Sequence, residues 1–261
     1  MITDYTSSTF PILKPSDVES RRFSRVVHRL TVPINCGWSD EEIVTLSTSA
    51  KSDLVILRSP SSRYRLGGAL GSLSGYRTLH ADSLLYFSRD LMRALDADQI
   101  PGKLHLATDS PVTHQLSRLI LATFAAYQNH YSANPSLRRD AVEQGYAEWA
   151  ASIVASPSGT VLTINDEERP VSFIVVSTFA SQTGDRHAEI SLNGTHPAYR
   201  NKGLYRTLLT HCMRHLASHD VKRLWISTQA SHRVMIRTWE KLGLGFELGL
   251  NTYHVSPISD Y

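Results

Sequence analysis

The sequence predicts an α/β protein with a smaller N-terminal part and a larger C-terminal part. One observation is the stretch 191–216, which has the pattern of a strand, a tight basic turn and an amphipathic helix. The other is the alternation of short β-branched runs with helical runs along the whole chain. The order is β-α-β-α-β over about the first 90 residues, and β-α-α-β-β-β-α-β-α-β from residue 103 onward.

The stretch 191–216 shows both periodicities in sequence. Apolar and polar residues alternate over 190–193, as in a half-buried strand, and Pro197 ends that strand because proline cannot donate a ladder hydrogen bond. Apolar residues then recur at helical spacing. They are Leu204, Leu208, Leu209, Cys212, Met213 and Leu216.

The turn between this strand and helix has the composition of an anion site. The first turn of a helix has free N–H groups and the positive end of the helix dipole. Gly203 has no Cβ, so an anion can approach the backbone, and Arg200 and Lys202 add positive charge. An ordinary basic turn between core elements is an equally open interpretation.

The N-terminal part is predicted to begin with a loose or extended arm over residues 1–22. Strands are expected over 23–32, 54–57 and 76–88, with a helix beginning at 39–42 and another over 61–74. The polar stretch 89–102 carries Asp96, Asp98, Pro101 and Gly102, so it is the expected boundary between domains over 1–95 and 96–261.

The C-terminal part is predicted from residue 103 onward. An irregular loop over 127–136, rich in aromatic and polar residues, is a candidate for ligand contact, although its rings could instead anchor the loop. The predicted strands cover 103–108, 159–164, 170–177, 186–195, 221–228 and 251–255, and the helices cover 110–127, 137–155, 204–216 and 231–242.

Composition excludes several classes of protein. A net charge of +3 is too small to indicate nucleic-acid binding, and no apolar run approaches the ~18 residues of a membrane span. Cys36 and Cys212 suggest no disulfide framework, the first residues do not resemble a signal peptide, and a cytoplasmic location is expected. Twelve histidines show no metal-ligand spacing, so no metal is expected.

The stretch THPAYRNKGLYRTLL, residues 195–209, resembles motif A of the GNAT superfamily of acyl-CoA-dependent N-acyltransferases. Arg200 and Gly203 stand where that motif has its Arg or Gln and its first Gly, and Tyr205 stands where Gly or Ala is usual. The order of elements over 103–255 is also similar. The resemblance implies a mixed, mostly antiparallel sheet splayed around a CoA cleft. The N-terminal part resembles a degenerate second half of the same fold, although a small αβ cap of separate ancestry is an alternative.

Within the superfamily, the chain resembles TDP-fucosamine acetyltransferase and related N-acyltransferases of amino-sugar nucleotides. The small N-terminal domain and the stretches 124–154 and 224–255 carry this resemblance. The last stretch also departs from the pattern, with His232 in place of an Asn and Trp239 in place of a Tyr that commonly protonates the leaving thiolate. Tryptophan cannot act as that acid.

The resemblance implies transfer of an acetyl or other short acyl group from acetyl-CoA, or another acyl-CoA, to a primary amine. The implied acceptor is a small molecule, foremost a nucleotide-linked amino sugar, and a homodimer is possible. An aminoglycoside, amino acid or antibiotic-like acceptor, or an inactive acyl-CoA-binding module, stays open. The implied cofactor-binding residues are Leu192, Asn193, Gly194, Thr195, Arg200, Asn201, Lys202, Gly203, Leu204, Tyr205, His232 and Trp239.

Four residues are candidates for proton transfer. Glu189 is the first candidate base, because the family often places a base on this strand; a surface carboxylate paired with Arg186 or His187 is the alternative. His130 is a second candidate base, with a structural loop histidine as its alternative. The candidate acids are His232, which could instead contact water at a helix start, and Tyr253, which could simply close the last strand.

Overall fold

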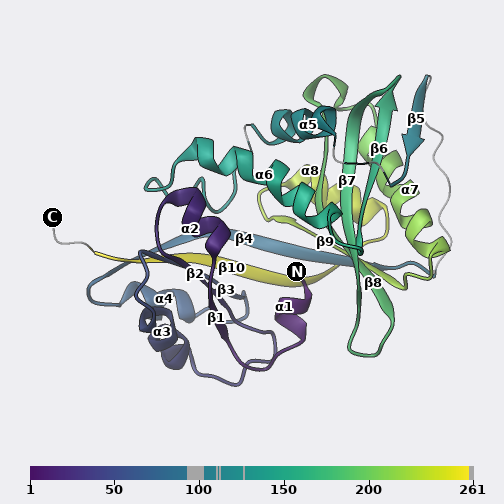
Figure 1. Cartoon of the computed structure of the whole chain (residues 1–261). Helices are drawn as coiled ribbons and strands as arrows, with labels where there is room; N and C mark the ends of the chain where they lie inside the picture. The colour runs from purple at the N-terminus through teal and green to yellow at the C-terminus, as the bar shows by residue number, and fades with distance from the viewer. Residues whose placement is uncertain (93–102, 110, 112, 126, 259–261) are drawn as a thin grey trace.

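The computed structural model describes residues 1–92, 103–109, 111, 113–125 and 127–258. Ten strands form one mixed sheet in the order β1-β2-β3-β10-β4-β9-β8-β7-β6-β5 (Figure 1). Within the described ranges, only β2–β3 and β8–β9 are parallel pairs, so the predicted mixed, mostly antiparallel sheet is confirmed. The strands are β1 (Ile12–Pro15), β2 (Val27–Thr31), β3 (Leu54–Pro60), β4 (Tyr76–Asp90), β5 (Leu104–Ala107), β6 (Gly159–Asp166), β7 (Arg169–Ala180), β8 (Arg186–Thr195), β9 (Arg223–Gln229) and β10 (Gly245–Pro257).

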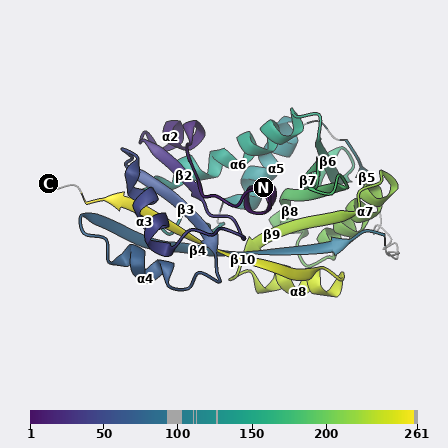
Figure 2. The same cartoon turned by 90° about the horizontal axis from the view of Figure 1, so that it is seen from below.

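Helices cover both faces of the sheet. Figure 2 shows α2, α5 and α6 on one face and α3, α4 and α8 on the other. None of the helices in the described ranges is long and apolar enough to cross a membrane. The helices are α1 (Thr3–Thr6), α2 (Asp17–Phe23), α3 (Asp40–Ser49), α4 (Leu66–Gly71), α5 (His114–Phe124), α6 (Arg139–Val154), α7 (Leu204–Ser218) and α8 (Arg233–Lys241), with a short 3₁₀ turn over Pro197–Tyr199.

The core of the C-terminal part forms two layers, one on each face of β6–β8. The predicted apolar stripe of α7 is fully or almost fully buried and packs with Trp239 of α8 against Ile174 and Val176. On the opposite face, α5 and α6 pack on Phe173 and Val175, as the alternation of side chains along a strand requires. The predicted helix face is therefore confirmed.

The two parts of the chain exchange strands within this sheet. The segments β2-α3-β3-α4-β4 and β8-α7-β9-α8-β10 repeat one order of elements, each around a parallel strand pair. However, β4 pairs with β9 of the second segment, and β10 pairs with β3 of the first. The predicted boundary at residue 95 falls within 93–102, outside the described residues, and the division into two domains stays a prediction.

The N-terminal arm is a correction to the sequence analysis. Residues 1–22, expected to be loose or extended, contain α1, β1 and most of α2. Ile2 and Tyr5 are buried against β4 and β10, and β1 pairs with β2 at the edge of the sheet. These contacts join segments that are distant in sequence, so local composition does not show them.

Two other predicted bounds were too wide. The strand expected over 23–32 begins at Val27, because α2 runs to Phe23 and ends at Ser24, which adopts the left-handed conformation. The helix expected over 61–74 forms only over α4, Leu66–Gly71. Three of its six residues are glycines, Gly67, Gly68 and Gly71, and they weaken the helix and limit its length.

Candidate active site

Strands β8 and β9 separate after four paired residues. They pair in parallel over His187–Ile190 and Arg223–Ile226, and no further pair joins them among the described residues. Ser191 is the extra residue of a β-bulge, because Val176 lies opposite Ile190 and Val175 lies opposite Leu192. A bulge bends its strand, which accounts for the divergence.

The bulge also changes which face the strand residues occupy. Ala188 and Ile190 pack against α7, whereas Leu192 packs on the α5 side. The sequence analysis placed Ile190 and Leu192 on one face, as in a regular strand, and this part of the prediction is wrong. Beyond the bulge, the side of β8 that faces away from β7 is open to a ligand.

The turn before α7 provides a helix start without a side-chain cap. Asn201 and Gly203 have φ values of 61° and 77°, in the left-handed region that glycine and asparagine tolerate best. Gly203 is the N-cap and gives no side-chain cap, and a Cβ built there would meet nothing within 4 Å. A ligand can therefore approach the helix start at Gly203, and the first turn carries no acid.

A cavity of about 1060 Å³ extends from this turn, through the gap between β8 and β9, to the region under α2 and α6. Most of the predicted cofactor residues line it: Leu192, Asn193, Gly194, Thr195, Arg200, Asn201, Gly203, Tyr205, His232 and Trp239. Of the described residues predicted to bind cofactor, only two lie elsewhere. The ammonium of Lys202 lies 5.0 Å from the ring centre of Tyr199, and Leu204 is buried in the core.

Trp239 is a packing residue at the edge of this cavity. Its side chain is completely buried, its Nε1 donates to the Tyr205 hydroxyl at 2.9 Å, and its ring contacts Phe87 edge-on. The two departures from the family pattern therefore contact each other, because Tyr205 and Trp239 form one hydrogen-bonded pair.

Glu189 is buried and lines the cavity. One carboxylate oxygen accepts from the Ile2 N–H at 2.7 Å, and the other accepts from the Tyr86 hydroxyl at 3.2 Å. Burial raises the pKa of this carboxyl, and the nearby N-terminal ammonium opposes the rise. The alternative of a surface carboxylate paired with Arg186 or His187 is wrong, because Glu189 is only 4% exposed.

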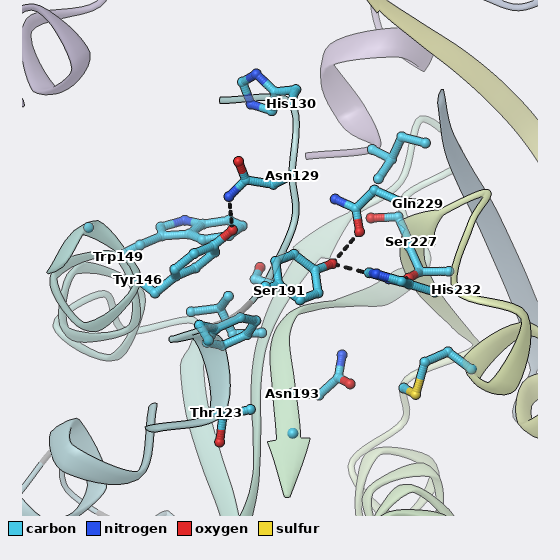
Figure 3. A pocket seen from close by; sticks show the side chains of 18 of the residues that line it. Thr123, Asn129, His130, Tyr146, Trp149, Ser191, Asn193, Ser227, Gln229 and His232 are labelled. Carbon is cyan, nitrogen blue, oxygen red and sulfur yellow. Dashed lines mark hydrogen bonds between the residues drawn. The ribbon is translucent and has the colours of Figure 1, made fainter. Parts of the chain in front are cut away.

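His232 lies where α8 begins, on the opposite side of the gap. Its Nδ1 is 2.9 Å from the Thr228 hydroxyl and 3.5 Å from the Tyr127 hydroxyl, which donates to Gln229. Figure 3 shows His232 and Gln229 close together on one side of the pocket. Burial lowers the pKa of His232, so the imidazole is neutral in the free protein at pH 7. The role of His232 as the acid that protonates the thiolate stays a prediction.

Tyr127 is the residue that the sequence reasoning did not assign. It belongs to the aromatic loop expected to contact ligand, and its hydroxyl lies between Gln229 and His232. Burial raises the pKa of Tyr127, so the phenol keeps its proton across the physiological range. The signal was the loop itself, but no local pattern distinguished Tyr127 from Tyr131.

The other two candidates lie apart from the gap. His130 is buried at the far end of the cavity, with its Nδ1 3.0 Å from Nε2 of His254, and burial holds its pKa well below the usual value. Tyr253 packs in the N-terminal core on the α4 side and is not among the residues that line this cavity. Strand alternation points it away from its neighbours Thr252 and His254.

The far end of the cavity contains a buried ionic network. Arg29 donates to both carboxylate oxygens of Glu19 at 2.7 and 2.6 Å, and the Tyr131 hydroxyl also donates to Glu19. Burial tends to raise the pKa of Glu19, but these donors outweigh it and lower the pKa to about 2. Among the described residues, no group of three His, Cys, Asp or Glu side chains could hold a metal ion.

Comparison with known proteins agrees with this geometry. Residues 123–244 match the model of the acetyltransferase (GNAT) family. A search of curated proteins finds no match. One similar solved structure is a GCN5-related N-acetyltransferase from Sphaerobacter thermophilus, with 15% identity and a TM-score of 0.60, covering 96% of this chain and 78% of that one. A tandem GNAT protein from the clavulanic acid biosynthesis pathway has 12% identity and a TM-score of 0.59, covering 90% of this chain and 76% of that one. An acetyltransferase of the GNAT family from Novosphingobium aromaticivorans has 15% identity and a TM-score of 0.51, covering 88% of this chain and 84% of that one.

At these identities the structures show a shared fold, and the family match covers the bulged strand β8, the turn at Gly203 and the helices α7 and α8. The gap between β8 and β9, with an uncapped helix start beside it, therefore lies in a matched segment. Residues 123–244, slightly under half of the chain, are therefore similar to the acetyltransferase (GNAT) family, and the solved structures share its fold.

Proposed function

We propose that this protein transfers an acetyl or other short acyl group from acyl-CoA to a primary amine of a small polar acceptor. One observation carries the proposal. The gap opened by the Ser191 bulge joins, within one cavity, the free N–H groups at the start of α7 to the buried carboxylate of Glu189. A thioester, an anionic cofactor and an amine need that combination.

The cofactor would lie along the gap with its pyrophosphate at the start of α7. The donors there are the N–H groups that follow Gly203, and Arg200 adds charge while its Nε holds the Thr195 carbonyl at 3.2 Å. The open backbone of β8 beyond Ser191 would bind the pantetheine arm. Its N–H groups are the donors available for the oxyanion of the tetrahedral intermediate.

Glu189 is the proposed base. An amine arrives protonated at neutral pH and must lose a proton before its lone pair attacks the thioester carbonyl. A carboxylate with a raised pKa is suited to accept that proton, directly or through a water molecule. The tetrahedral intermediate then collapses, the C–S bond breaks, and the amide and CoA thiolate are released.

Tyr127 is the proposed donor to the departing sulfur. Trp239 cannot supply an acidic proton, and His232 is neutral, whereas the phenol of Tyr127 is protonated and lines the same cavity. A thiol pKa near ~8.5 makes the thiolate a fair leaving group, so a hydrogen bond from Tyr127 is sufficient help.

The acceptor class rests on the sequence resemblance. Nucleotide-linked amino sugars are the first acceptors to test, followed by aminoglycosides and amino acids. The alternative that the domain binds acyl-CoA without catalysis predicts binding but no turnover on any of these amines.

Isothermal titration with acetyl-CoA tests the cofactor site. Gly203→Asp places a carboxylate against the predicted phosphates, and Gly203→Asn is its matched control, because both carry the same backbone cost at a positive φ. We expect micromolar binding in wild type, weaker binding in Gly203→Asn and at least a further ~10-fold loss in Gly203→Asp. Absence of binding to acetyl-CoA and longer acyl-CoAs in the wild type would refute the proposal.

A further inference from the structure

Two opposite charges without ionic partners line the far end of the cavity. Both carboxylate oxygens of Asp82 are buried and accept no hydrogen bond from the described residues. Arg58 also lines the cavity; its Nε donates to the Thr252 hydroxyl at 3.0 Å, and no carboxylate of the described chain lies within 4.0 Å of its guanidinium. Neither side chain takes part in the proposed chemistry at Glu189 and Tyr127.

The register of the sheet places these two residues on one row. Thr252 of β10 lies opposite Asp82 of β4 on one side and opposite Arg58 of β3 on the other. Residues on such a row point to the same face, and their Cα atoms are two strand spacings apart, about 9 to 10 Å. Arg58 and Asp82 therefore stand on either side of Thr252, with room for a small group between their charged ends.

A β-bulge aims Asp82 into the cavity. Thr252 lies opposite Asp82 but Tyr253 lies opposite His80, so Ala81 is the extra residue in β4. Bulges redirect the side chains beside them and are common next to ligand sites. The charge of Asp82 is also felt by Tyr127 and Tyr146, so the carboxylate lies close to the aromatic wall of the cavity.

Leaving the buried carboxylate of Asp82 without a hydrogen-bond partner is costly, because it has lost its hydration. The charge of Asp82 favours the charged form of Arg58, whose guanidinium interacts with Thr252 and Tyr5, but the two residues form no ion pair within 4.0 Å in the described part of the chain. A ligand that carries both charges would satisfy both residues at once. A direct ion pair, formed by rotation of the two side chains, is the competing explanation.

We propose that Arg58 and Asp82 bind the zwitterionic head of the acceptor, with its carboxylate on Arg58 and its ammonium on Asp82. The acceptor is then a diamino acid of the lysine or ornithine kind, acylated on its distal amine. This inference rests on the proposed acyltransferase function and narrows its acceptor class. It gives the N-terminal part of the chain, which contributes both residues, a direct role in specificity.

The length of a lysine side chain is comparable to the distance along β4 from Asp82 to the gap between β8 and β9. The gap opens level with Leu84 to Tyr86 of β4, because Gln229 lies opposite Leu84 and Ser227 lies opposite Tyr86. Asp82 is two to four residues from that level, about 7 to 14 Å along the strand. An extended lysine side chain spans about 6 Å from Cα to Nζ. A charge-assisted hydrogen bond adds about 2.8 Å, which brings the distal amine to the gap.

Three matched amines test the assignment with acetyl-CoA as donor. Lysine carries both head charges, 6-aminohexanoate lacks the α-ammonium, and cadaverine lacks the carboxylate. We expect kcat/KM for lysine or ornithine to exceed that of both analogues by ~10-fold or more. Asp82→Asn should lower kcat/KM for lysine ~10-fold, chiefly through KM, and leave 6-aminohexanoate unchanged. Arg58→Gln should weaken lysine and 6-aminohexanoate but not cadaverine.

A second measurement does not depend on turnover. With CoA present, lysine should raise the melting temperature of the wild-type protein more than 6-aminohexanoate or cadaverine does, and Asp82→Asn should lose the difference. Equal shifts and equal rates for the three amines would overturn the inference, as would Asp82→Asn with a lowered melting temperature and unchanged kinetics, which indicates a structural ion pair. Turnover of nucleotide-linked amino sugars unaffected by Asp82→Asn would overturn it and leave the proposed function standing. Absence of acetyl-CoA binding would instead refute the proposed function.

Discussion

The two β-α-β units of this chain differ at the point where a ligand could enter. In the N-terminal unit, β2 and β3 pair over the whole length of β2, from Val27 to Thr31. In the C-terminal unit, β8 and β9 pair over four residues and then separate at the Ser191 bulge. One extra residue in a strand therefore distinguishes a closed structural pair from an open cleft.

The helices of the two units begin differently as well. Ser39 and Glu42 form a complete capping box at the start of α3, and Asp40 and Glu41 add two more acids to its first turn. The start of α7 has Gly203 and neither a side-chain cap nor an acid. The first helix satisfies its own N–H groups and repels anions, whereas the second leaves its N–H groups for an anion.

The third paired residue of the first strand also differs between the two parallel pairs, because its charge is opposite in the two units. Glu189 of β8 is a buried carboxylate that keeps a raised pKa, while Arg29 of β2 is a guanidinium already neutralised by Glu19. The same position in the repeated topology thus holds a reactive group in one unit and a satisfied ion pair in the other. The repeated topology therefore places a residue at the same position in both units, and the side chain at that position determines whether it is available for proton transfer.

Glu189→Gln is the strongest test of this difference. We expect kcat/KM for the amine to fall ~100-fold or more at pH 7, because general-base catalysis contributes 10²- to 10⁴-fold. The loss of rate on acidification should vanish in the variant, while the dissociation constant of acetyl-CoA stays within about twofold. A variant that retains the wild-type rate and pH profile would remove Glu189 from the mechanism.

Tyr127→Phe tests the proposed hydrogen-bond donor to the leaving thiolate, a role for which the N-terminal unit has no proposed counterpart. The variant keeps the ring packed against Phe124 and Tyr146 but removes the hydroxyl that donates to Gln229. We expect kcat to fall ~10-fold with little change in the KM for acetyl-CoA, because a thiolate can leave without full protonation. His232→Ala is the companion variant; if it alone lowers kcat, the donor is His232 and not Tyr127.

Ser39→Ala tests the closed helix start. Loss of the N-cap hydrogen bond should lower the free energy of unfolding by about 1 kcal/mol. For a chain of this size that corresponds to a fall of about 2–4 °C in melting temperature. Acetyl-CoA affinity should be unchanged, in contrast to Gly203→Asp, so a change in affinity would show that the N-terminal unit also holds cofactor.

The smallest expected effect is in the pH dependence of stability. Burial raises the pKa of Glu189 above its unfolded value of 4.5, so the folded state binds this proton more tightly. Its contribution to stability is complete below pH 4.5 and is lost as the pH rises through the folded pKa. Glu189→Gln should therefore gain melting temperature relative to wild type between pH 4 and pH 8; a constant difference would contradict the assignment.

The sequence by itself determined the elements whose causes are local. The buried stripe of α7 follows from the spacing of its apolar residues, and the turn before it follows from a glycine and an asparagine that tolerate positive φ. The order of strands and helices could be predicted for the same reason, whereas the sheet that they form was implied by the resemblance to the GNAT superfamily. Periodicity and backbone freedom are properties of neighbouring residues.

Tertiary structure decided what depends on residues far apart in the chain. The N-terminal segment became ordered because it packs on β4 and β10, and Ile2 covers Glu189 across 187 positions. Tyr253 was directed into the core by the alternation of β10. The exchange of β4 and β10 brought Asp82 and Arg58 to the cavity. Strand pairing and burial join distant segments, and no local pattern carries that information.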